Sequence, residues 1–501
     1  MSINIMIKFG KILLLLCLLT ACGAEDKADL PVYQVIDDLK DKKMGVLTGC
    51  FQEELLEKRY PEMEVLRIDS PPDMVQALLT KRCEAFVLDD YMTGYYMHDV
   101  KGVITLEEPF VTSELAICFA KGKNKDLQEQ FSAFFNQIKA DGTYDEMYNR
   151  WVLNAHEAVM PDIPMPKEGK PLRMGTSSTA PPLAYIESGK LVGLEVEIMA
   201  RFAASIGRSA VWSDMNFPAI IPALVSGNQD IVFGGISITE ARKEAIDFSE
   251  PSLVAQSMIA IRAENSAGYV AVAEEEDDQS FIDSVRTGFQ RNILEEDRYL
   301  MILDGLKLSA LIALLASLFG TVLGGVICWM RMGCSALLRN LAGLYIGLMR
   351  GTPVLVLLMI MFYVVFAGTS ITAVTVSVIT FGMNFGAYVS EMFRSSIENV
   401  DRGQTEAGIA LGFSPVKTFV YIVMPQAFKQ VLPVYKGELV SLVKMTSIVG
   451  YIAVQDLTKV GDIIRSRTFD AFFPLIMVAV LYFILSWIFA AVLDMIGKKV
   501  S

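Results

Sequence analysis

Hydrophobic and polar residues follow two different patterns before and after residue 300. Before it, short apolar runs such as residues 44–47 and 85–88 end near glycine or aspartate and are followed by segments with helical periodicity. Strands that alternate with helices predict a parallel sheet, which binds ligands at the carboxyl ends of its strands. After residue 300, the apolar runs approach the roughly 20 residues that cross a membrane. The pattern therefore predicts an α/β part followed by an all-α membrane part.

Five apolar runs are expected to span the membrane, at residues 306–330, 351–368, 371–390, 432–454 and 473–494. Basic residues gather between the first two runs, between the third and the fourth, and at the C-terminus. Cytoplasmic loops carry an excess of lysine and arginine, so we expect the α/β part outside and the C-terminus inside. The loop 455–470 departs mildly from this rule, because it contains Lys459, Arg465 and Arg467 among three aspartates.

The composition narrows the possible functions. The chain has 501 residues, of which 52% are hydrophobic and 20% charged, and its net charge is −13. Such an acidic chain is a poor partner for a phosphate backbone, so nucleic-acid binding is not expected. His98 and His156, which lie far apart, argue against a histidine-rich metal site or a Ser-His-Asp triad. No catalytic residue, metal or cofactor is expected.

Residues 1–22 have the features of a secretory signal, because Lys8 and Lys11 border a short apolar run. The tetrapeptide LTAC at residues 19–22 resembles the bacterial lipobox, whose cysteine is lipidated and becomes the new N-terminus. An ordinary cleavage site with an accidental cysteine is the alternative. A lipid on Cys22 would hold the following residues at the outer face of a membrane.

The rest of the chain divides into five segments. They are an α/β unit at residues 30–151, a proline-rich linker at 152–170, a second α/β unit at 171–263, an acidic connector at 264–300 and a transmembrane domain at 301–497. Prolines stiffen the linker and disfavour regular structure in it. The two α/β units thus precede the whole membrane part.

Both α/β units resemble parts of type II periplasmic binding proteins for polar amino acids. LVGLEVEI, IIPALVSGNQDIVFGGISITEAR and IDFSEP in residues 171–263 resemble the first lobe of that family. DLKDKKMGVLTG, EAFVLDD and KADGTYDEMYNRW in residues 30–151 resemble the second lobe. The resemblance implies one bilobed α/β module whose lobes occur in reversed, permuted order. Two incomplete halves that each pair with another chain are the alternative.

The permuted order carries an expectation about the hinge between the lobes. We expect a single covalent crossover near residues 103–120. Residues 254–262 are expected to leave for the membrane instead of entering the other lobe.

The resemblance also implies a site for the carboxylate and the ammonium of an amino acid. Arg242, in a helix opened by Ser237 and Thr239, matches the arginine that forks the ligand carboxylate, and Ser237 assists it. Guanidinium groups and helix N-termini both favour carboxylates. Asp89 matches the residue that takes the ammonium, and Phe217 matches a wall of the cleft. Alone, each of these residues has an ordinary explanation as a surface arginine, a turn cap or core packing.

Gly49 follows a strand and is expected at the cleft. Around it, the residues of the expected cleft differ from those typical of the family. Phe51 stands where the family has threonine, Cys50 replaces a hydroxyl residue, and Ala180 replaces an aromatic residue that stacks on the ligand. The α-amino acid group is still matched, whereas the side-chain specificity of the family does not carry over. A different small acid is the alternative ligand.

The most specific motif follows the third apolar run. Its residues are Glu406, Ala407, Gly408, Gly412 and Pro425. The spacing resembles the EAA loop of ABC importer permeases, E-A-A-x3-G-x9-I-x-L-P, and the resemblance to polar amino acid permeases extends over residues 300–495. It implies that small residues let a short helix enter a groove on an ATPase, that Gly412 permits a turn, and that Pro425 marks a helix break. An interfacial amphipathic helix is the alternative.

Charged and polar residues inside the fourth apolar run are candidates for the translocation pathway. They are Glu438, Lys444, Thr446 and Ser447. Charges inside a membrane are costly and usually functional, although a structural pair or a position at the membrane rim is an equal alternative. Met445 stands where many polar amino acid permeases have aspartate, so one guide to the charge of the substrate is lost.

The chain contains no P-loop, because none of its Gly-Lys pairs is followed by serine or threonine. The resemblance therefore implies a transport subunit, not an enzyme, that is driven by two copies of a separate ABC ATPase subunit. It would capture a polar amino acid or similar small zwitterion outside and translocate it as a homodimer in the bacterial inner membrane. A ligand-gated channel or a regulatory sensor with the same bilobed domain is the alternative.

Overall fold

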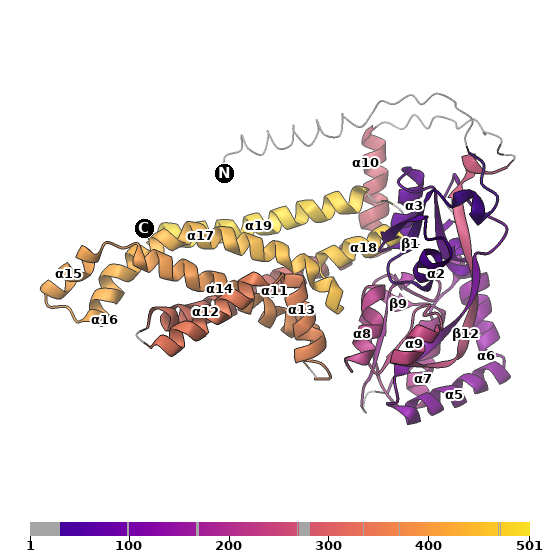
Figure 1. Ribbon diagram of the computed structural model, residues 1–501, viewed down its shortest axis with the longest axis horizontal. Helices are drawn as coiled ribbons and strands as arrows, with labels where there is room; N and C mark the ends of the chain where they lie inside the picture. The colour runs from indigo at the N-terminus through magenta and orange to yellow at the C-terminus, as the bar shows by residue number, and fades with distance from the viewer. Residues whose placement is uncertain are drawn as a thin grey trace.

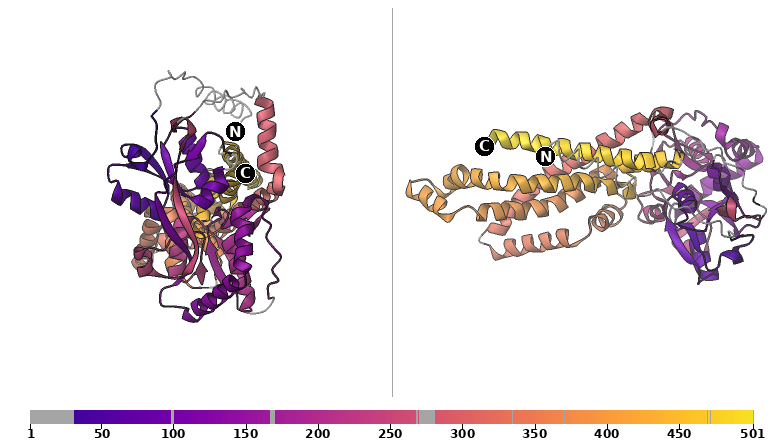
Figure 2. Two further views of the ribbon diagram at one scale, coloured as in Figure 1. Left: turned by 90° about the vertical axis from the view of Figure 1, so that its right-hand side faces the viewer. Right: turned by 90° about the horizontal axis from the view of Figure 1, so that it is seen from above.

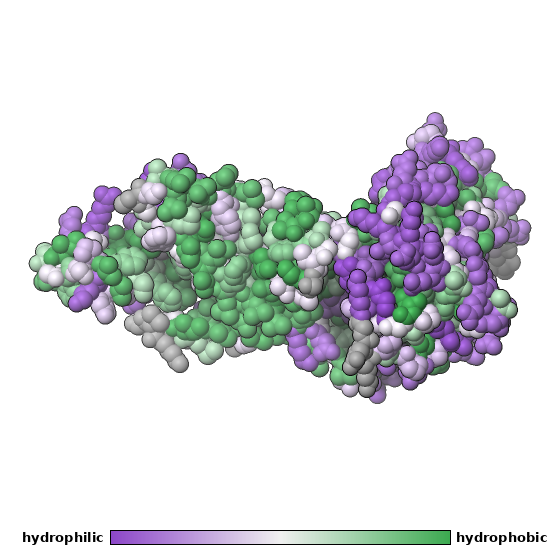
Figure 3. Space-filling view, turned by 90° about the horizontal axis from the view of Figure 1, so that it is seen from below, coloured by the Kyte–Doolittle hydropathy of each residue, from purple (hydrophilic) through white to green (hydrophobic). Residues whose placement is uncertain are grey.

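The computed structural model describes residues 31–97, 100–166, 170–267, 269, 281–333, 335–369, 371–468, 470 and 472–500. An α/β unit lies at one end of the molecule and a bundle of long helices extends from it (Figure 1). The surface of the α/β unit is mostly polar, and that of the bundle is mostly apolar (Figure 3). The predicted signal sequence, Cys22 and the acidic run 274–278 lie outside the described residues.

One nine-stranded sheet forms the core of the α/β unit, in the order β10-β6-β11-β5-β12-β3-β1-β2, with β4 beside β12. The strands are β1 (Lys43–Leu47), β2 (Glu64–Ile68), β3 (Ala85–Asp89), β4 (Val103–Thr105), β5 (Val111–Ala120), β6 (Leu172–Thr176), β10 (Ala210–Asp214), β11 (Ile231–Val232) and β12 (Ile246–Arg262). A small second sheet contains β7 (Thr179–Ala180), β8 (Ala184–Glu187) and β9 (Lys190–Val192). The strands β1, β2 and β3 are parallel, and so are β6, β10 and β11, as the alternating pattern predicts.

Two groups of helices cover the two ends of this sheet (Figures 1 and 2). The N-terminal lobe (residues 31–110) contains α2 (Phe51–Arg59), α3 (Pro71–Leu79) and α4 (Asp90–Met97). The central lobe (residues 121–245) contains α5 (Lys125–Ala140), α6 (Thr143–Tyr148), α7 (Leu194–Ser205), α8 (Ile220–Val225) and α9 (Glu240–Ala245).

Residues 125–153 pack on the central lobe, although the sequence groups them with the first α/β unit. The ring of Phe131 in α5 lies edge-on to that of Phe202 in α7, with centroids 5.1 Å apart. The indole nitrogen of Trp151 donates to Glu197 of α7 over 2.7 Å. The reason is the amphipathic pattern of α5, whose apolar side chains face α7.

Two strands cross between the lobes, so the prediction of a single crossover is wrong. β5 and β12 pair with each other over most of their length. Residues 257–261 of β12 then pair with β3, and Arg262 pairs with Val103 of β4, so β12 enters the N-terminal lobe instead of leaving for the membrane. Its 17 residues are long enough to satisfy backbone hydrogen bonds in both lobes.

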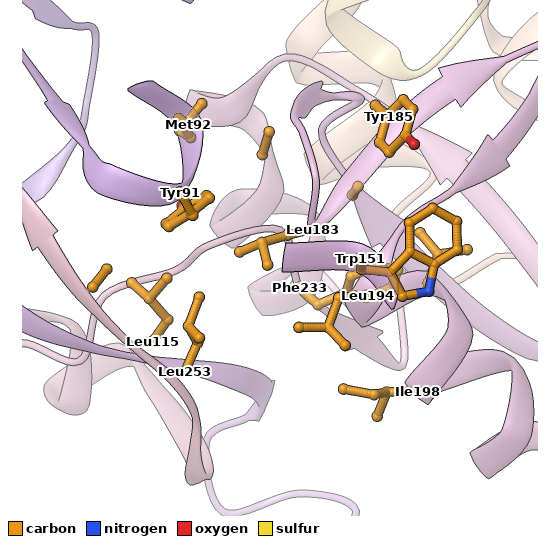
Figure 4. Close-up of a cluster of buried hydrophobic side chains, with 14 of the residues drawn as sticks. Tyr91, Met92, Leu115, Trp151, Leu183, Tyr185, Leu194, Ile198, Phe233 and Leu253 are labelled. Atoms are coloured by element: carbon orange, nitrogen blue, oxygen red, sulfur yellow. The ribbon is translucent and has the colours of Figure 1, made fainter. Parts of the chain in front are cut away.

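A hydrophobic cluster extends through both lobes. Figure 4 shows Tyr91 of the N-terminal lobe near Leu183 of the central lobe, with Leu115 and Leu253 from the crossing strands beside them. All four side chains are buried or nearly so. The two lobes therefore pair within this chain, and their burial against each other stabilises the unit.

The membrane part consists of helices joined by short turns. They are α10 (Phe281–Phe289), α11 (Arg298–Met332), α12 (Ala336–Gly351), α13 (Val354–Ile360), α14 (Ala373–Glu398), α15 (Arg402–Ala410), α16 (Pro415–Thr418), α17 (Met424–Met445), α18 (Leu457–Thr468) and α19 (Phe472–Val500). Among the described residues, three helices are long and apolar enough to cross a membrane, or up to five if each of two bent pairs forms one span. The first, third and fifth predicted runs fall in those three helices.

The second predicted run, 351–368, contains a helix only over Val354–Val365, because the chain bends at the start of the run. The helices on either side of Thr352 and Pro353 meet at 108°. Thr352 is extended, as expected for a residue before proline, and this conformation ends α12. The fourth run also differs, because α17 continues into a 3-10 helix at Thr446–Ile452 before the chain bends by 57° toward α18.

The two ends of the bundle have different neighbours. α15 and α16 lie at the end far from the α/β unit, whereas α18 lies beside that unit (Figures 1 and 2). The EAA-like motif and the bilobed unit are therefore separated by the length of the membrane helices.

Candidate functional site

A cavity of about 30 Å³ lies between the two lobes. Its walls come from Leu47, residues 50–52 and 87–89, Tyr91 and Met92 of the N-terminal lobe and from Thr179, Ala180, Phe217, Gly234, Gly235 and Ser237 of the central lobe. Four predicted ligand residues line it, namely Asp89, Phe51, Phe217 and Ser237. These positions follow the carboxyl ends of parallel strands in both lobes, where α/β proteins bind ligands.

Asp89 is the last residue of β3, and its side chain is buried. Its Oδ1 accepts hydrogen bonds from Gln52 Nε2 and Ser257 Oγ, each over 2.8 Å. Its Oδ2 accepts only a long bond of 3.5 Å from the Tyr91 hydroxyl among the described contacts. Oδ2 can therefore accept a hydrogen bond from a ligand ammonium.

The pH dependence of amino-acid binding tests this role. Burial raises the pKa of the Asp89 carboxyl to about 6. Because an ammonium pairs with the ionised carboxylate, affinity is expected to fall as the pH drops through about 6. Calorimetric titrations above and below this pH check the prediction. An Asp89→Asn variant with the same pH profile would contradict it.

The stability of the ligand-free unit should change with pH in the opposite direction to the affinity. The pKa of Asp89 is raised on folding, so its contribution to stability is fully present below the unfolded pKa and is lost as the pH rises through about 6. The increase in unfolding temperature on adding ligand should consequently be larger at neutral than at acidic pH.

Arg242 lies beside the cavity and links the two lobes. Its backbone N–H donates to Thr239 Oγ1 over 3.2 Å, so Thr239 caps α9 as predicted. The guanidinium donates to the Ser237 carbonyl over 2.9 Å and to the Gly49 carbonyl of the N-terminal lobe over 3.2 Å. A guanidinium has five N–H donors, so these two bonds leave others for a carboxylate. Burial lowers the pKa of Arg242, although the group stays charged.

Sequence reasoning missed several residues of this site. Gln52 and Tyr91 contact Asp89, and Gln52 follows the Gly49 turn closely enough to have been a candidate. Ser257 gave no such signal, because it meets Asp89 only through the register of β12 against β3. Contacts of this kind depend on tertiary pairing.

Glu195 is a further buried residue that the sequence did not single out. Its Oε2 accepts the backbone N–H of Gly234 over 2.7 Å and of Gly235 over 3.1 Å, and its Oε1 accepts the Ser252 hydroxyl over 2.8 Å. Burial raises the pKa of this carboxyl. Glu195 thereby fixes the glycine turn that lines the cavity.

The lobes are closed on each other in this structure. A cavity of about 30 Å³ has room for little more than a water molecule. A Cβ added to Gly235, whose φ is +74°, would lie 2.6 Å from the Tyr91 hydroxyl oxygen. The side chains from the two lobes thus meet across the cleft, and a ligand must separate them to enter.

The EAA-like motif forms a compact turn at the far end of the bundle. Gly412 has a φ of +87° in the turn between α15 and α16, as predicted. A Cβ on Gly408 would lie 2.6 Å from Thr418 Cγ2, so its small size is needed for the packing of this turn. Glu406 and Ala407 are exposed beside it.

Pro425 does not break the helix, which corrects an expectation about this motif. A π-helix at Phe419–Val423 leads directly into α17, with Pro425 in its first turn. Proline needs no N–H donor at this position, and the wider π turn relieves its clash with the preceding turn.

The four candidate pathway residues do not share one cavity. Lys444 and Ser447 line a groove of about 630 Å³ between α17 and α19. Thr446 is buried and donates to the Val443 carbonyl over 2.8 Å. Glu438 is half-buried and is not among the described residues that line the groove.

Comparisons with known proteins cover both parts of the chain. The family model of bacterial extracellular solute-binding proteins, family 3, matches residues 172–408, a range that begins at β6 and continues into the helical part. YckA of Bacillus subtilis (strain 168), named as an amino-acid ABC transporter permease protein, is 36% identical over 199 residues, which are 40% of this chain and 88% of YckA.

GlnP of Rickettsia bellii (strain RML369-C), named as a glutamine transport system permease protein, is 32% identical over 213 residues, which are 42% of this chain and 98% of GlnP. This chain belongs to the amino-acid ABC transporter permeases. In a crystal structure of an amino acid ABC transporter with histidines, the matching chain is 31% identical to this one. The match covers 44% of this chain and 99% of that one, with a TM-score of 0.38. Membership in the permease family implies an ATPase partner and an amino acid substrate.

Proposed function

We propose that this permease is the membrane subunit of an ATP-driven importer that captures a polar amino acid, or a similar small zwitterion, in its own α/β unit. The observation that supports it is that Asp89 lines the closed cavity from one lobe, while Arg242 of the other lobe bonds to Ser237, which also lines it. A carboxylate and a guanidinium in this arrangement complement the two charges of an amino acid.

Binding would proceed by closure of the lobes around the ligand. The ligand carboxylate takes the free donors of Arg242 with help from Ser237, and the ammonium takes Oδ2 of Asp89. Phe51 and Phe217 close the cleft from opposite lobes. Exclusion of water strengthens both charge interactions, because the local dielectric is low.

The α/β unit is a solute-binding domain with its lobes in permuted order. Two findings support this assignment. The solute-binding family model starts at residue 172, in the second unit of the chain, and the N-terminal lobe completes the same sheet. The bilobed domain would lie on the extracytoplasmic side and deliver its ligand to the helices beside it.

The EAA-like turn would dock the ATPase on the cytoplasmic side. Large apolar side chains are exposed around Glu406, including Ile409 (51% exposed), Leu411 (77%), Val416 (73%) and Tyr421 (69%). An apolar patch of this kind marks a surface for a partner. Cys22 stays a predicted lipidation site, and the inner membrane is the proposed location.

A second copy of this chain would complete the pore. Only 11% of the apolar window of the span Phe472–Gly497 is buried within the chain, and the groove with Lys444 and Ser447 opens beside it. A homodimer with two ATPase subunits would bring two such grooves together.

The test is uptake of labelled amino acids by proteoliposomes that contain this chain and its ATPase partner. An importer accumulates one of them only with ATP. A channel would pass it without ATP, and a sensor would bind it without accumulation, so either result would replace this proposal. A thermal-shift screen of free amino acids identifies the candidates to label.

A further inference from the structure

The helix α18 (Leu457–Thr468) lies between the bundle and the α/β unit (Figure 1). Leu457, Val460 and Ile464 are buried in a cluster with Ile302 of α11 and Val478 of α19. Residues three and four apart form one stripe of a helix, so this stripe anchors α18 to the permease. Its cations Lys459, Arg465 and Arg467 lie off the stripe and contact the α/β unit.

Lys459 is fixed to the central lobe. Its Nζ lies 3.2 Å from Asn216 Oδ1 and 3.7 Å from Asp214 Oδ2, and the side chains of Lys459 and Asp214 are each only 4% exposed. Asp214 also accepts the backbone N–H and the hydroxyl of Ser178 over 2.8 and 2.9 Å. A lysine buried this deeply requires its partner, since an unpaired charge there is strongly unfavourable.

Arg465 is fixed to the N-terminal lobe. Its guanidinium forms an ion pair with Asp73 in the first turn of α3, and a second one with Asp462 of its own helix over 3.1 Å. Asp73 also accepts the hydroxyl of Ser70, the N-cap of α3, over 2.7 Å. Only 17% of the Arg465 side chain is exposed.

Both acidic partners lie at the rim of the cleft. Asp214 ends β10, and Asp73 begins the helix that follows β2. Both positions lie at or just after the carboxyl ends of parallel strands, the edges that also carry the cavity-lining residues. α18 therefore bridges the two rims on the side that faces the permease.

Arg467 strengthens the attachment to the central lobe. It donates to the Ile186 carbonyl over 2.7 Å and pairs with Glu187 over 3.4 Å. A third bond of 2.7 Å reaches Glu296, just before α11. The basic residues that depart from the positive-inside rule thus have acidic partners in the outer part of the protein.

We propose that α18 clamps both lobes in the closed arrangement, and that Lys459 and Arg465 are positioning residues that transmit lobe separation to the permease helices. One 12-residue helix holds both rims, so the lobes cannot separate about β5 and β12 without breaking Lys459–Asp214 or Arg465–Asp73. This inference rests on the proposed function only where it concerns transport.

A distance measurement tests the clamp without any ligand. Spin labels are attached through unnatural amino acids at the exposed positions Lys58 and Glu244, on opposite lobes, in full-length chain with its ATPase in proteoliposomes. The wild type should give one narrow distance distribution. Arg465→Glu should add a longer distance, and Arg465→Lys, which keeps the charge, should not.

Uptake measurements test whether lobe separation is transmitted to the permease helices. Arg465→Asp and Asp73→Arg should each lower the maximal rate of amino-acid uptake at least tenfold, and the double variant should recover to within about threefold of wild type. The matched control is Lys40→Glu, which reverses one charge of the exposed Lys40–Asp37 pair and should change nothing. Calorimetric binding to the single variants shows that the lobes are folded.

The outcomes separate this inference from the proposed function. Unchanged distances in Arg465→Glu, or a double variant no better than the singles, overturns the clamp even if the wild type imports an amino acid. If the wild type neither binds nor imports amino acids but Arg465→Glu still adds the longer distance, the clamp is supported and the proposed function is overturned.

Discussion

Replacing Arg242 by alanine should weaken amino-acid binding about a hundredfold or more. The variant removes the cation that we propose to bind the ligand carboxylate, and it removes the bond to the Gly49 carbonyl of the other lobe. Losing one partner of a buried, hydrogen-bonded charge pair costs about 3 kcal/mol or more, and about 1.4 kcal/mol is tenfold in affinity. Isothermal titration of the full-length protein in detergent measures the effect.

The neighbouring Lys243 provides the control for this variant. It lies on the same short helix, but its ammonium pairs with the exposed Glu240 over 2.8 Å. Lys243→Ala should therefore bind amino acids as the wild type does. If Arg242→Ala and Lys243→Ala bound amino acids with equal affinity, Arg242 would not be part of the site. The ligand carboxylate would then have no proposed cationic partner.

Leu411→Asp should abolish uptake by separating the permease from its ATPase. Leu411 is 77% exposed at the tip of the EAA-like turn, so a carboxylate there leaves this chain intact but is strongly disfavoured in an apolar contact. Truncating a central interface residue costs about 2–4 kcal/mol, which corresponds to at least a thirtyfold loss of association. Co-purification with the ATPase and ATP-dependent uptake are the measurements.

A matched variant on the other side of the molecule controls for a general effect of the charge. Val159 is 73% exposed in the linker of the α/β unit. Val159→Asp should keep both ATPase association and uptake, and Leu411→Asp should keep amino-acid binding. If Leu411→Asp transports normally, the exposed turn does not carry the ATPase contact.

Local signals in the sequence predicted much of the fold. The alternation of short apolar runs with helical segments indicated the parallel strands, because period-2 and period-3.6 patterns are properties of neighbouring residues. Thr239 was placed as a helix cap and Gly412 in a turn for the same reason, and both are confirmed. Asp89 was placed at the end of a strand, which the structure also confirms.

Long-range pairing was not predictable in the same way. Residues 254–262 were expected to leave for the membrane, yet this second half of the 17-residue strand β12 pairs with β3 and β4 of the N-terminal lobe. Nothing local distinguishes a strand that stops from one that continues into another lobe. For this reason Ser257 was missed as a partner of Asp89, and the crossover count was wrong.

The effect of a proline on a helix was also not predictable from the sequence alone. Pro353 lies where the chain turns by 108°, whereas Pro425 lies in a helix that continues. Both prolines lack a backbone donor, so the difference arises from what surrounds them: an extended residue before Pro353 and a π turn before Pro425.

The sequence by itself determined that an α/β unit precedes apolar helices, that the motif at 406–425 belongs to an importer permease, and that no P-loop is present. These features depend on composition and on spacing along the chain. Only the tertiary structure decided that both lobes share one sheet, that Asp89 lines a cavity between them while Arg242 bonds to Ser237 and Gly49 on either side, and that α18 touches both rims. The physical reason is that strand register and the burial of charges are properties of surfaces that meet only after folding.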